Sequence, residues 1–222
     1  MRISFKKSLA NAVAIMTVAA LVFGFAAITT TANAQITPPA FWIEPQLVNI
    51  TTSEGYNVGD KFNATVWIDS GTYASFTWQA MVTFNESLLM ATRMGYTNGS
   101  VSEFFQGHTT VPVTPVITNT SAYTGETLMG TDTKLAGNGT LCWVEFQILM
   151  EPTGSEVITT TLSISNTDTF LLDGDLVEIA TNKYNAEYYY IVPEFTTMIL
   201  AVLMAVSAVA MIVYRKKLVR LP

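Results

Sequence analysis

The sequence predicts an all-β domain, a sandwich or jelly roll, that lies between two apolar ends. Two observations support this prediction. Apolar and polar residues alternate with a period of two in several short segments, and turn-forming residues separate those segments. Between the apolar ends, no segment shows the 3.6-residue apolar period of a convincing helix. About 155 residues remain when both ends are set aside, which is enough for one domain with a substantial core.

The N-terminal residues 1–34 are predicted to be a secretory signal peptide. Three basic residues among the first seven precede an apolar stretch, residues 9–28, and Ala32-Asn33-Ala34 has the small-x-small pattern of a cleavage site. Cleavage is expected between Ala34 and Gln35. Because the apolar stretch is long for a signal peptide, an uncleaved anchor is the alternative, and both place the middle of the chain outside the cell.

Residues 35–43 are expected to form an N-terminal extension, and residues 44–192 the sandwich. The clearest strands are residues 62–68 and 76–84, in which apolar side chains alternate with mostly polar ones. Further strand candidates are residues 47–51, 89–96, 113–118, 127–132, 141–150, 157–165, 169–172, 176–180 and 187–192. Turns rich in Gly, Asn and Asp separate them at residues 57–60, 69–71, 98–99, 137–139 and 173–175. Residues 85–90 could form a short helical turn capped by Asn85.

Residues 193–214 are predicted to hold a sorting motif and a transmembrane helix, followed by a basic cytoplasmic tail, residues 215–222. No charged side chain occurs from Phe195 to Tyr214, and about twenty residues at 1.5 Å per residue cover the roughly 30 Å hydrocarbon core. Because a basic cluster follows, the positive-inside tendency places the C-terminus in the cytoplasm. A buried core helix is the alternative, but such a helix normally has a polar face.

The charge of the exported part is strongly acidic. Between residues 35 and 192, sixteen Asp and Glu residues face only four Lys and Arg residues, a net charge of about −12. Such a surface repels nucleic acid and offers no basic patch for phosphates, so a DNA or RNA partner is excluded.

The residues give little support to catalysis, and neither a cofactor nor a metal site is expected. His108 is the only histidine, and because no nucleophile-elbow pattern accompanies it, a plain loop residue is favoured over a Ser-His-Asp triad. Cys142 shares its face of a strand with apolar residues and is predicted to be a buried, inert thiol. Asp173 and Asp175 favour a turn over a glycosidase pair or a calcium site.

Trp67 is the candidate ligand-binding residue, because it shares its side of the predicted strand with the polar residues Asn63 and Thr65. There it could contact a sugar ring or a protein partner. Six of the ten asparagines between residues 35 and 192 lie in N-glycosylation sequons, more than chance would place there. The predicted glycosylation sites are Asn49, Asn63, Asn85, Asn98, Asn119 and Asn138. A glycan on Asn63, about 13 Å from Trp67, would crowd the tryptophan.

Three motifs, taken in order, resemble those of the cohesin family over about residues 44–192. Val58-Gly59-Asp60 leads into an alternating strand, Phe84-Asn85-Glu86-Ser87-Leu88 follows the next one, and Gly137-Asn138-Gly139-Thr140-Leu141 leads into a third. The chain has Asn85-Glu86 where the family commonly has Asp-Pro. The resemblance implies a non-catalytic jelly roll of about nine strands. Cohesins bind dockerin modules and, in cellulose-degrading bacteria, assemble polysaccharide-degrading enzymes on scaffolds.

The C-terminal end has a second resemblance. Pro193-Glu194-Phe195, an apolar span and a basic end are similar to the archaeal PEF-type sorting signal, which an archaeosortase processes. An ordinary stop-transfer anchor is the alternative. Both imply a protein of the cell surface that is initially held in the membrane, with its N-terminal domain outside.

Together these features predict a non-catalytic, archaeal cell-surface scaffold module. It would present an acidic β-sandwich to a dockerin-type protein, in connection with polysaccharide catabolism. The alternatives are a carbohydrate-binding module of the same fold, which would bind a surface polysaccharide through exposed aromatic residues, and a structural subunit of the cell envelope.

Overall fold

The computed structural model describes residues 35–51, 57–130, 136–152 and 157–191. Within these ranges the chain forms strands and no α-helix, so the all-β prediction is confirmed. The described part therefore contains no helix long and apolar enough to cross a membrane. The predicted signal peptide, sorting motif, apolar span and basic tail all lie outside the described residues.

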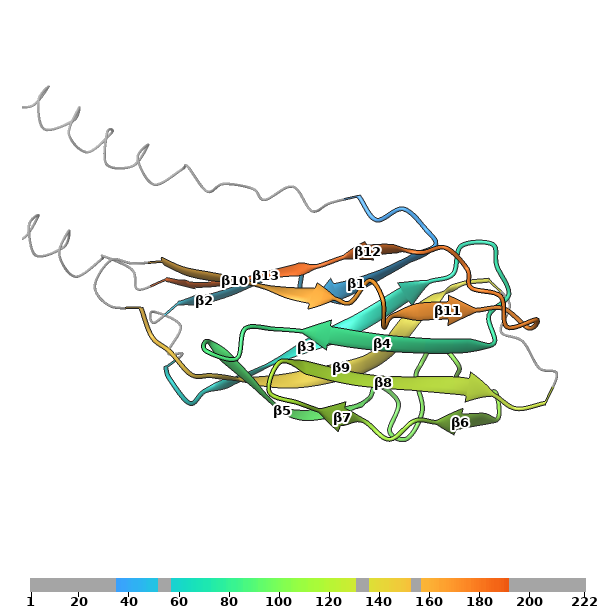
Figure 1. Ribbon diagram of the computed structural model, residues 1–222, viewed down its shortest axis with the longest axis horizontal. Helices are drawn as coiled ribbons and strands as arrows, with labels where there is room; N and C mark the ends of the chain where they lie inside the picture. The colour runs from blue at the N-terminus through green and yellow to red at the C-terminus, as the bar shows by residue number, and fades with distance from the viewer. Residues whose placement is uncertain (1–34, 52–56, 131–135, 153–156, 192–222) are drawn as a thin grey trace, which may run out of the picture. The chain divides into compact units, whose positions relative to one another are not determined.

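The described strands number thirteen and form two sheets (Figure 1). Their bounds are β1 Ala40–Glu44, β2 Leu47–Thr51, β3 Lys61–Asp69, β4 Thr77–Thr83, β5 Leu89–Tyr96, β6 Thr110–Pro112, β7 Val116–Ile117, β8 Ser121–Leu128, β9 Asn138–Ile148, β10 Val157–Ile164, β11 Phe170–Leu172, β12 Asn182–Tyr184 and β13 Ala186–Ile191. The first sheet has the order β12-β1-β3-β9-β5. The second has the order β2-β13-β10-β4-β8-β6, with β11 added to β4 and β7 added to β8.

Two parallel pairs make both sheets mixed. β1 lies parallel to β12, and β2 lies parallel to β13, so the first strands of the domain are hydrogen-bonded to its last ones. All other neighbours are antiparallel. Both pairings therefore join segments that are far apart in the sequence.

The core lies between the two sheets and comes from the period-two pattern of their strands. On β3, Ala64, Val66 and Ile68 are buried while their sequence neighbours point outward. Phe62 on the first sheet stacks on Tyr188 of the second with ring centroids 5.6 Å apart. These contacts between the sheets support the predicted sandwich. Apolar burial of this kind contributes about 25 cal/mol for each Å² removed from water.

Strand β1 begins inside the predicted N-terminal extension, residues 35–43, and takes up its last four residues. Phe41 and Ile43 are fully buried and pair with Ile68 and Val66 of β3. Because residues 40–43 are all apolar, this segment lacks the alternation of apolar and polar residues that predicts a strand. The side chain between them, Trp42, is buried on the other face of the sheet.

Two further strand predictions are wrong. Residues 176–180 form no strand, and only an isolated bridge joins Leu172 to Glu178. Residues 127–132 were expected to form a strand, but the strand there is β8, which ends at Leu128. Its inward positions include Thr124 and Glu126, both fully buried, so the apolar alternation that marks a strand is missing.

The segment after β4 is a single hydrogen-bonded turn in which Asn85 caps the chain as the sequence predicts, although the turn ends at Leu88 and not at residue 90. The amides of Leu88 and Leu89 both donate to the carbonyl oxygen of Asn85, at 3.1 and 3.0 Å. The side-chain oxygen of Asn85 accepts from the Ser87 amide at 3.0 Å, which satisfies the turn locally. β5 then begins at Leu89.

Gly125 lies in β8 where the chain has no room for a side chain. A Cβ atom added there would lie 2.8 Å from the Trp78 carbonyl oxygen, a backbone atom that cannot move independently. We therefore expect Gly125→Ala to lower the free energy of unfolding by about 1–3 kcal/mol. Chemical denaturation followed by circular dichroism would measure the loss. A change smaller than about 0.5 kcal/mol, typical of surface substitutions, would contradict this packing.

Candidate binding surface

The outer face of the five-stranded sheet carries an aromatic pair. Trp42 of β1 and Trp67 of β3 are directly opposite in the register, and their rings stack with centroids 5.8 Å apart and planes 17° apart. Trp67 is half-buried, while Trp42 is only 7% exposed. The sequence analysis identified Trp67 but missed Trp42, which lay in the expected extension.

Polar groups surround this pair. The indole nitrogen of Trp42 donates to a carboxylate oxygen of Glu44 at 3.0 Å. Tyr184 of β12 pairs with Trp42 in the register, and its hydroxyl oxygen accepts from the Thr37 amide at 3.1 Å. Hydrogen bonds thus hold the rings of Trp42 and Tyr184 in place, which lowers the entropic cost of binding a ligand.

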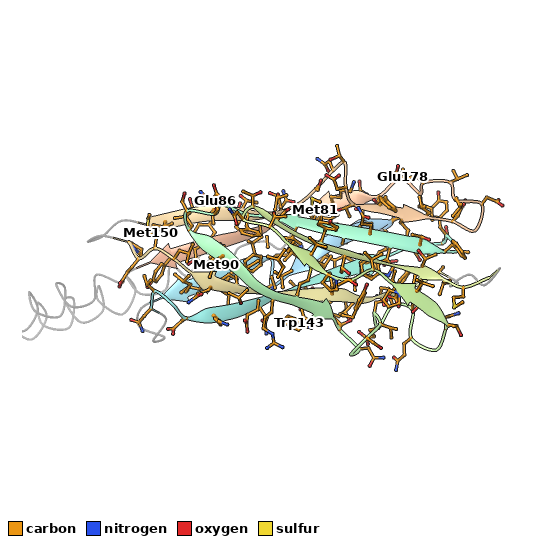
Figure 2. All side chains as sticks on the ribbon, turned by 60° about the horizontal axis from the view of Figure 1, so that its bottom comes forward. Met81, Glu86, Met90, Trp143, Met150 and Glu178 are labelled. Atoms are coloured by element: carbon orange, nitrogen blue, oxygen red, sulfur yellow. The ribbon has the colours of Figure 1, made fainter. Side chains whose placement is uncertain are left out.

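A third tryptophan of the same sheet, Trp143, is close to the other edge (Figure 2). Its indole nitrogen donates to the Tyr96 carbonyl oxygen at 3.2 Å, and its ring lies over Gly95, where a Cβ atom would come within 2.9 Å of the ring. The guanidinium carbon of Arg93 is 5.6 Å from the ring centroid. This distance is within the range of a cation–π contact.

A charged pair lies between these aromatic groups and one end of the sheet. Lys61 donates to Glu145 at 2.8 Å across β3 and β9. The hydrogen bond from Lys61, followed by that from Thr92, lowers the pKa of the Glu145 carboxyl group. The outer face of this sheet therefore offers aromatic rings and a fixed charge pair, and the lowered pKa of Glu145 makes this carboxyl group unsuited to act as a general acid.

Much of the aromatic ring surface on this face is already in contact with the protein itself. Because Trp42 and Trp67 stack on each other, a ligand would meet the part of Trp67 that this contact leaves exposed. Asn63 is exposed and lies on the same side of β3, as the strand period requires. A glycan on Asn63 would therefore project from the same face as Trp67.

The predicted glycosylation sites are distributed over several elements. All those with described side chains are exposed: Asn63, Asn85, Asn98, Asn119 and Asn138. Asn49 lies in β2, a strand at the edge of its sheet. Glycosylation stays a prediction, and exposure is the property that it requires. Of the predicted cleavage and sorting residues, Ala34, Pro193, Glu194 and Phe195 lie outside the described residues, while Gln35 is exposed at their N-terminal edge.

The residues considered for catalysis do not assemble into a site in the described part of the chain. The His108 amide donates to the Phe105 carbonyl oxygen at 3.1 Å within a loop. Asp173 accepts from the amides of Asp175 and Val177, both at 2.9 Å, as a turn residue does. No group of three or more His, Cys, Asp or Glu residues among the described ones could hold a metal ion.

An open hollow of about 540 Å³ lies where β10 passes the end of β4. Its lining consists of Thr83, Phe84, Asn85, Thr120, Thr160 and Thr161. These side chains provide hydroxyl and amide groups but neither an acid nor a base. The hollow therefore lacks the groups for acid–base chemistry.

Cys142 is fully buried on the inward side of β9, as the sequence predicts. Desolvation raises the pKa of its thiol far above the usual value, so the nucleophilic thiolate is scarcely populated. We expect a thiol-specific chromogenic reagent to modify no cysteine in the native chain, and one cysteine per chain after denaturation. Rapid stoichiometric reaction without denaturant would contradict the buried position.

Comparison with known proteins addresses the fold. No family model and no curated protein matches the sequence. A cohesin from Clostridium thermocellum, solved in complex with a dockerin, is similar with a TM-score of 0.50 and 8% identity. The matched region covers 73% of this chain and 100% of the cohesin chain. For a non-cellulosomal cohesin from the archaeon Archaeoglobus fulgidus, the TM-score is 0.47 at 12% identity, and the matched region covers 72% of this chain and 95% of the cohesin chain.

The fold is cohesin-like. The structural similarity to the Clostridium thermocellum cohesin supports this conclusion, and it confirms at the level of fold the resemblance that the three sequence motifs indicated. At 8% identity, the similarity extends to the fold alone. The cohesin-like sandwich of this chain has more strands than the expected nine, because its first and last strands are divided and short strands such as β7 and β11 are added.

Proposed function

We propose that the chain is a non-catalytic cell-surface module that binds a dockerin-type protein. The observation that supports this proposal is the cohesin-like fold, since the similar Clostridium thermocellum cohesin was solved bound to a dockerin. The acidic, exposed sandwich would recruit a dockerin-bearing enzyme of polysaccharide catabolism to the cell surface. Fold similarity is an argument by analogy, so the binding partner must be tested directly.

Capture from native surface extract tests this function. Full-length tagged chain is incubated with extract in calcium or in a chelator, because dockerin binding depends on calcium. We expect at least one protein with a dockerin module to be retained in calcium and lost in chelator. Retention of the same proteins in both conditions, or of none that carries such a module, would contradict a dockerin-type partner.

The module is proposed to be held at the membrane by its C-terminal apolar run, Phe195–Tyr214, with the sandwich outside the cell. The length of the run and the basic residues that follow it support this topology. Processing by an archaeosortase at Pro193-Glu194-Phe195 is the related proposal. Mass measurement of the mature protein distinguishes the two, because an intact C-terminal basic peptide means that the anchor is retained.

A second candidate function is carbohydrate binding, and the stacked Trp42–Trp67 pair favours it. Aromatic rings on a sheet surface can stack on sugar rings. We expect a carbohydrate-binding chain to be retained on a glycan array and Trp67→Ala to lose that retention, with Tyr73→Ala, an exposed aromatic residue in the loop before β4, as the control. Equal retention of both variants would exclude Trp67 as the contact residue.

A further inference from the structure

Four exposed apolar side chains lie at one end of the sandwich. Val58, Leu149, Met150 and Val157 are 49%, 39%, 47% and 51% exposed. We refer to these four residues as the end patch. Exposed apolar residues are common on protein surfaces when they occur singly, but a group at one place indicates a contact.

The backbone places the four residues of the end patch together. The Gly59 amide donates to the Ile148 carbonyl oxygen at 2.9 Å, so Val58 and Leu149 lie beside each other. Val157 begins β10 and pairs with Ile191, the last residue of β13. Figure 1 shows the end of β9 and the start of β10 at the same end of the sandwich, and Figure 2 shows Met150 at the end opposite to Glu178.

The chain length after Ile191 limits how far this end can lie from the membrane. Only Val192, Pro193 and Glu194 separate Ile191 from the apolar run that begins at Phe195. Four residue steps in fully extended chain cover at most about 14 Å. A headgroup layer is about 5–8 Å thick on each side of the hydrocarbon core. If Phe195 is at the edge of that core, Ile191 lies within about 14 Å of the core, so the end patch lies within the headgroup layer or just outside it.

The charges at this end favour shallow contact over deep insertion. Asp60, Lys61, Glu151 and Glu156 flank the end patch in the sequence, and no charged residue belongs to the patch itself. Carboxylates and ammonium groups can remain hydrated among lipid headgroups, while apolar side chains beside them enter the boundary with the acyl chains. The opposite end carries Glu178, with Asp173 and Asp175 in the same loop beside the exposed Leu176 and Val177, and the apolar run from Phe195 does not follow this loop.

We propose that the end patch rests on the lipid bilayer, at the boundary between headgroups and acyl chains. This inference depends on the proposed membrane anchor. The contact would hold the sandwich upright and leave the loop from Asp173 to Glu178 facing away from the cell. A dockerin-type partner would then reach the outer faces of the sheets and the far end.

Site-directed fluorescence in the full-length chain tests the end patch. Met150→Cys and the matched control Leu176→Cys, 63% exposed in the opposite loop, are each labelled under native conditions, in which Cys142 is buried. Both chains are reconstituted into phosphatidylcholine vesicles, with and without brominated acyl chains. We expect brominated lipid to quench the label at position 150 several-fold more than that at 176, and iodide to do the reverse. Both substitutions are at exposed positions and remove no core contact.

The outcomes separate this inference from the proposed function. Equal quenching of the two labels in chains that float with the vesicles would overturn the end patch and leave the anchor intact. Chains that do not float with the vesicles would overturn the anchor and the end patch together. Neither result affects binding of a dockerin-type partner, which is measured separately.

Discussion

Trp78→Ala is expected to lower the free energy of unfolding by about 3–5 kcal/mol, because it removes a large side chain from a core that cannot close around the cavity. Trp78 is fully buried on β4 and contacts Tyr96 edge to face, with ring centroids 6.0 Å apart and planes at 71°. Since β4 is in one sheet and Tyr96 ends β5 in the other, the substitution weakens the packing between the sheets. Urea denaturation followed by circular dichroism measures the loss.

Trp67→Ala is the matched control for this prediction. It removes the same side chain from the outer face of β3, where Trp67 is half-buried and stacks on Trp42. An aromatic pair of this kind is worth about 0.5–1.5 kcal/mol beyond the area that it buries, so the loss should be clearly smaller than for Trp78. Equal losses for the two variants would mean that Trp78 is not the centre of the core.

Glu126→Ala is expected to have the second largest effect, about 2–4 kcal/mol, since it leaves a cavity and a buried amide without its acceptor. Glu126 is fully buried on β8, and one of its carboxylate oxygens accepts from the Ser102 amide at 3.0 Å. That bond holds the loop between β5 and β6 against the sandwich. Chemical denaturation measures the stability, and hydrogen exchange at the Ser102 amide measures the release of the loop.

Glu126→Gln separates the hydrogen bond from the size of the side chain. Glutamine has almost the same volume and keeps an oxygen that can accept from Ser102. We expect the glutamine variant to retain most of the stability and the slow exchange of the Ser102 amide. If the alanine and glutamine variants lose the same amount, the hydrogen bond to Ser102 does not stabilise this loop.

The sequence predicted the strands whose inward residues are all apolar. A sheet with one buried face has apolar side chains at every second position of its strands. This pattern occurs on β3 at Phe62, Ala64 and Val66, and on β9 at Val144 and Phe146. The motifs around these strands also led to the cohesin-like fold that the structural comparison supports.

The misplaced elements have inward residues that do not look like a core. β8 buries Thr124, whose hydroxyl donates to Tyr96 and Val113, and Glu126, one of whose oxygens accepts from Ser102; all three partners are more than ten residues away in the sequence. No local sequence pattern predicts hydrogen-bond partners that are this far apart in the chain. The other carboxylate oxygen of Glu126 is buried without a partner among the described residues. β12 has only three residues, and it is a strand because β1 lies beside it. Tertiary pairing of this kind overrides local propensity.

Of the two stacked tryptophans on the candidate binding surface, the sequence predicted only one, because their contact also depends on tertiary pairing. Trp67 stood out because it occupies a polar side of an alternating strand. Its partner Trp42 lies between two buried residues, so nothing in its immediate sequence indicates an outward position. The stacking contact depends on the register between β1 and β3, which only the folded sheet reveals.

Titration of the purified full-length chain with the dockerin-type protein recovered from surface extract tests the proposed function most directly. The predicted result is saturable one-to-one binding in calcium, with a dissociation constant of about 1 μM or below, and at least about a hundredfold weaker binding in chelator. Saturable binding of equal strength in calcium and chelator would contradict a dockerin-type interaction. Absence of saturable binding in both would contradict a protein-binding module.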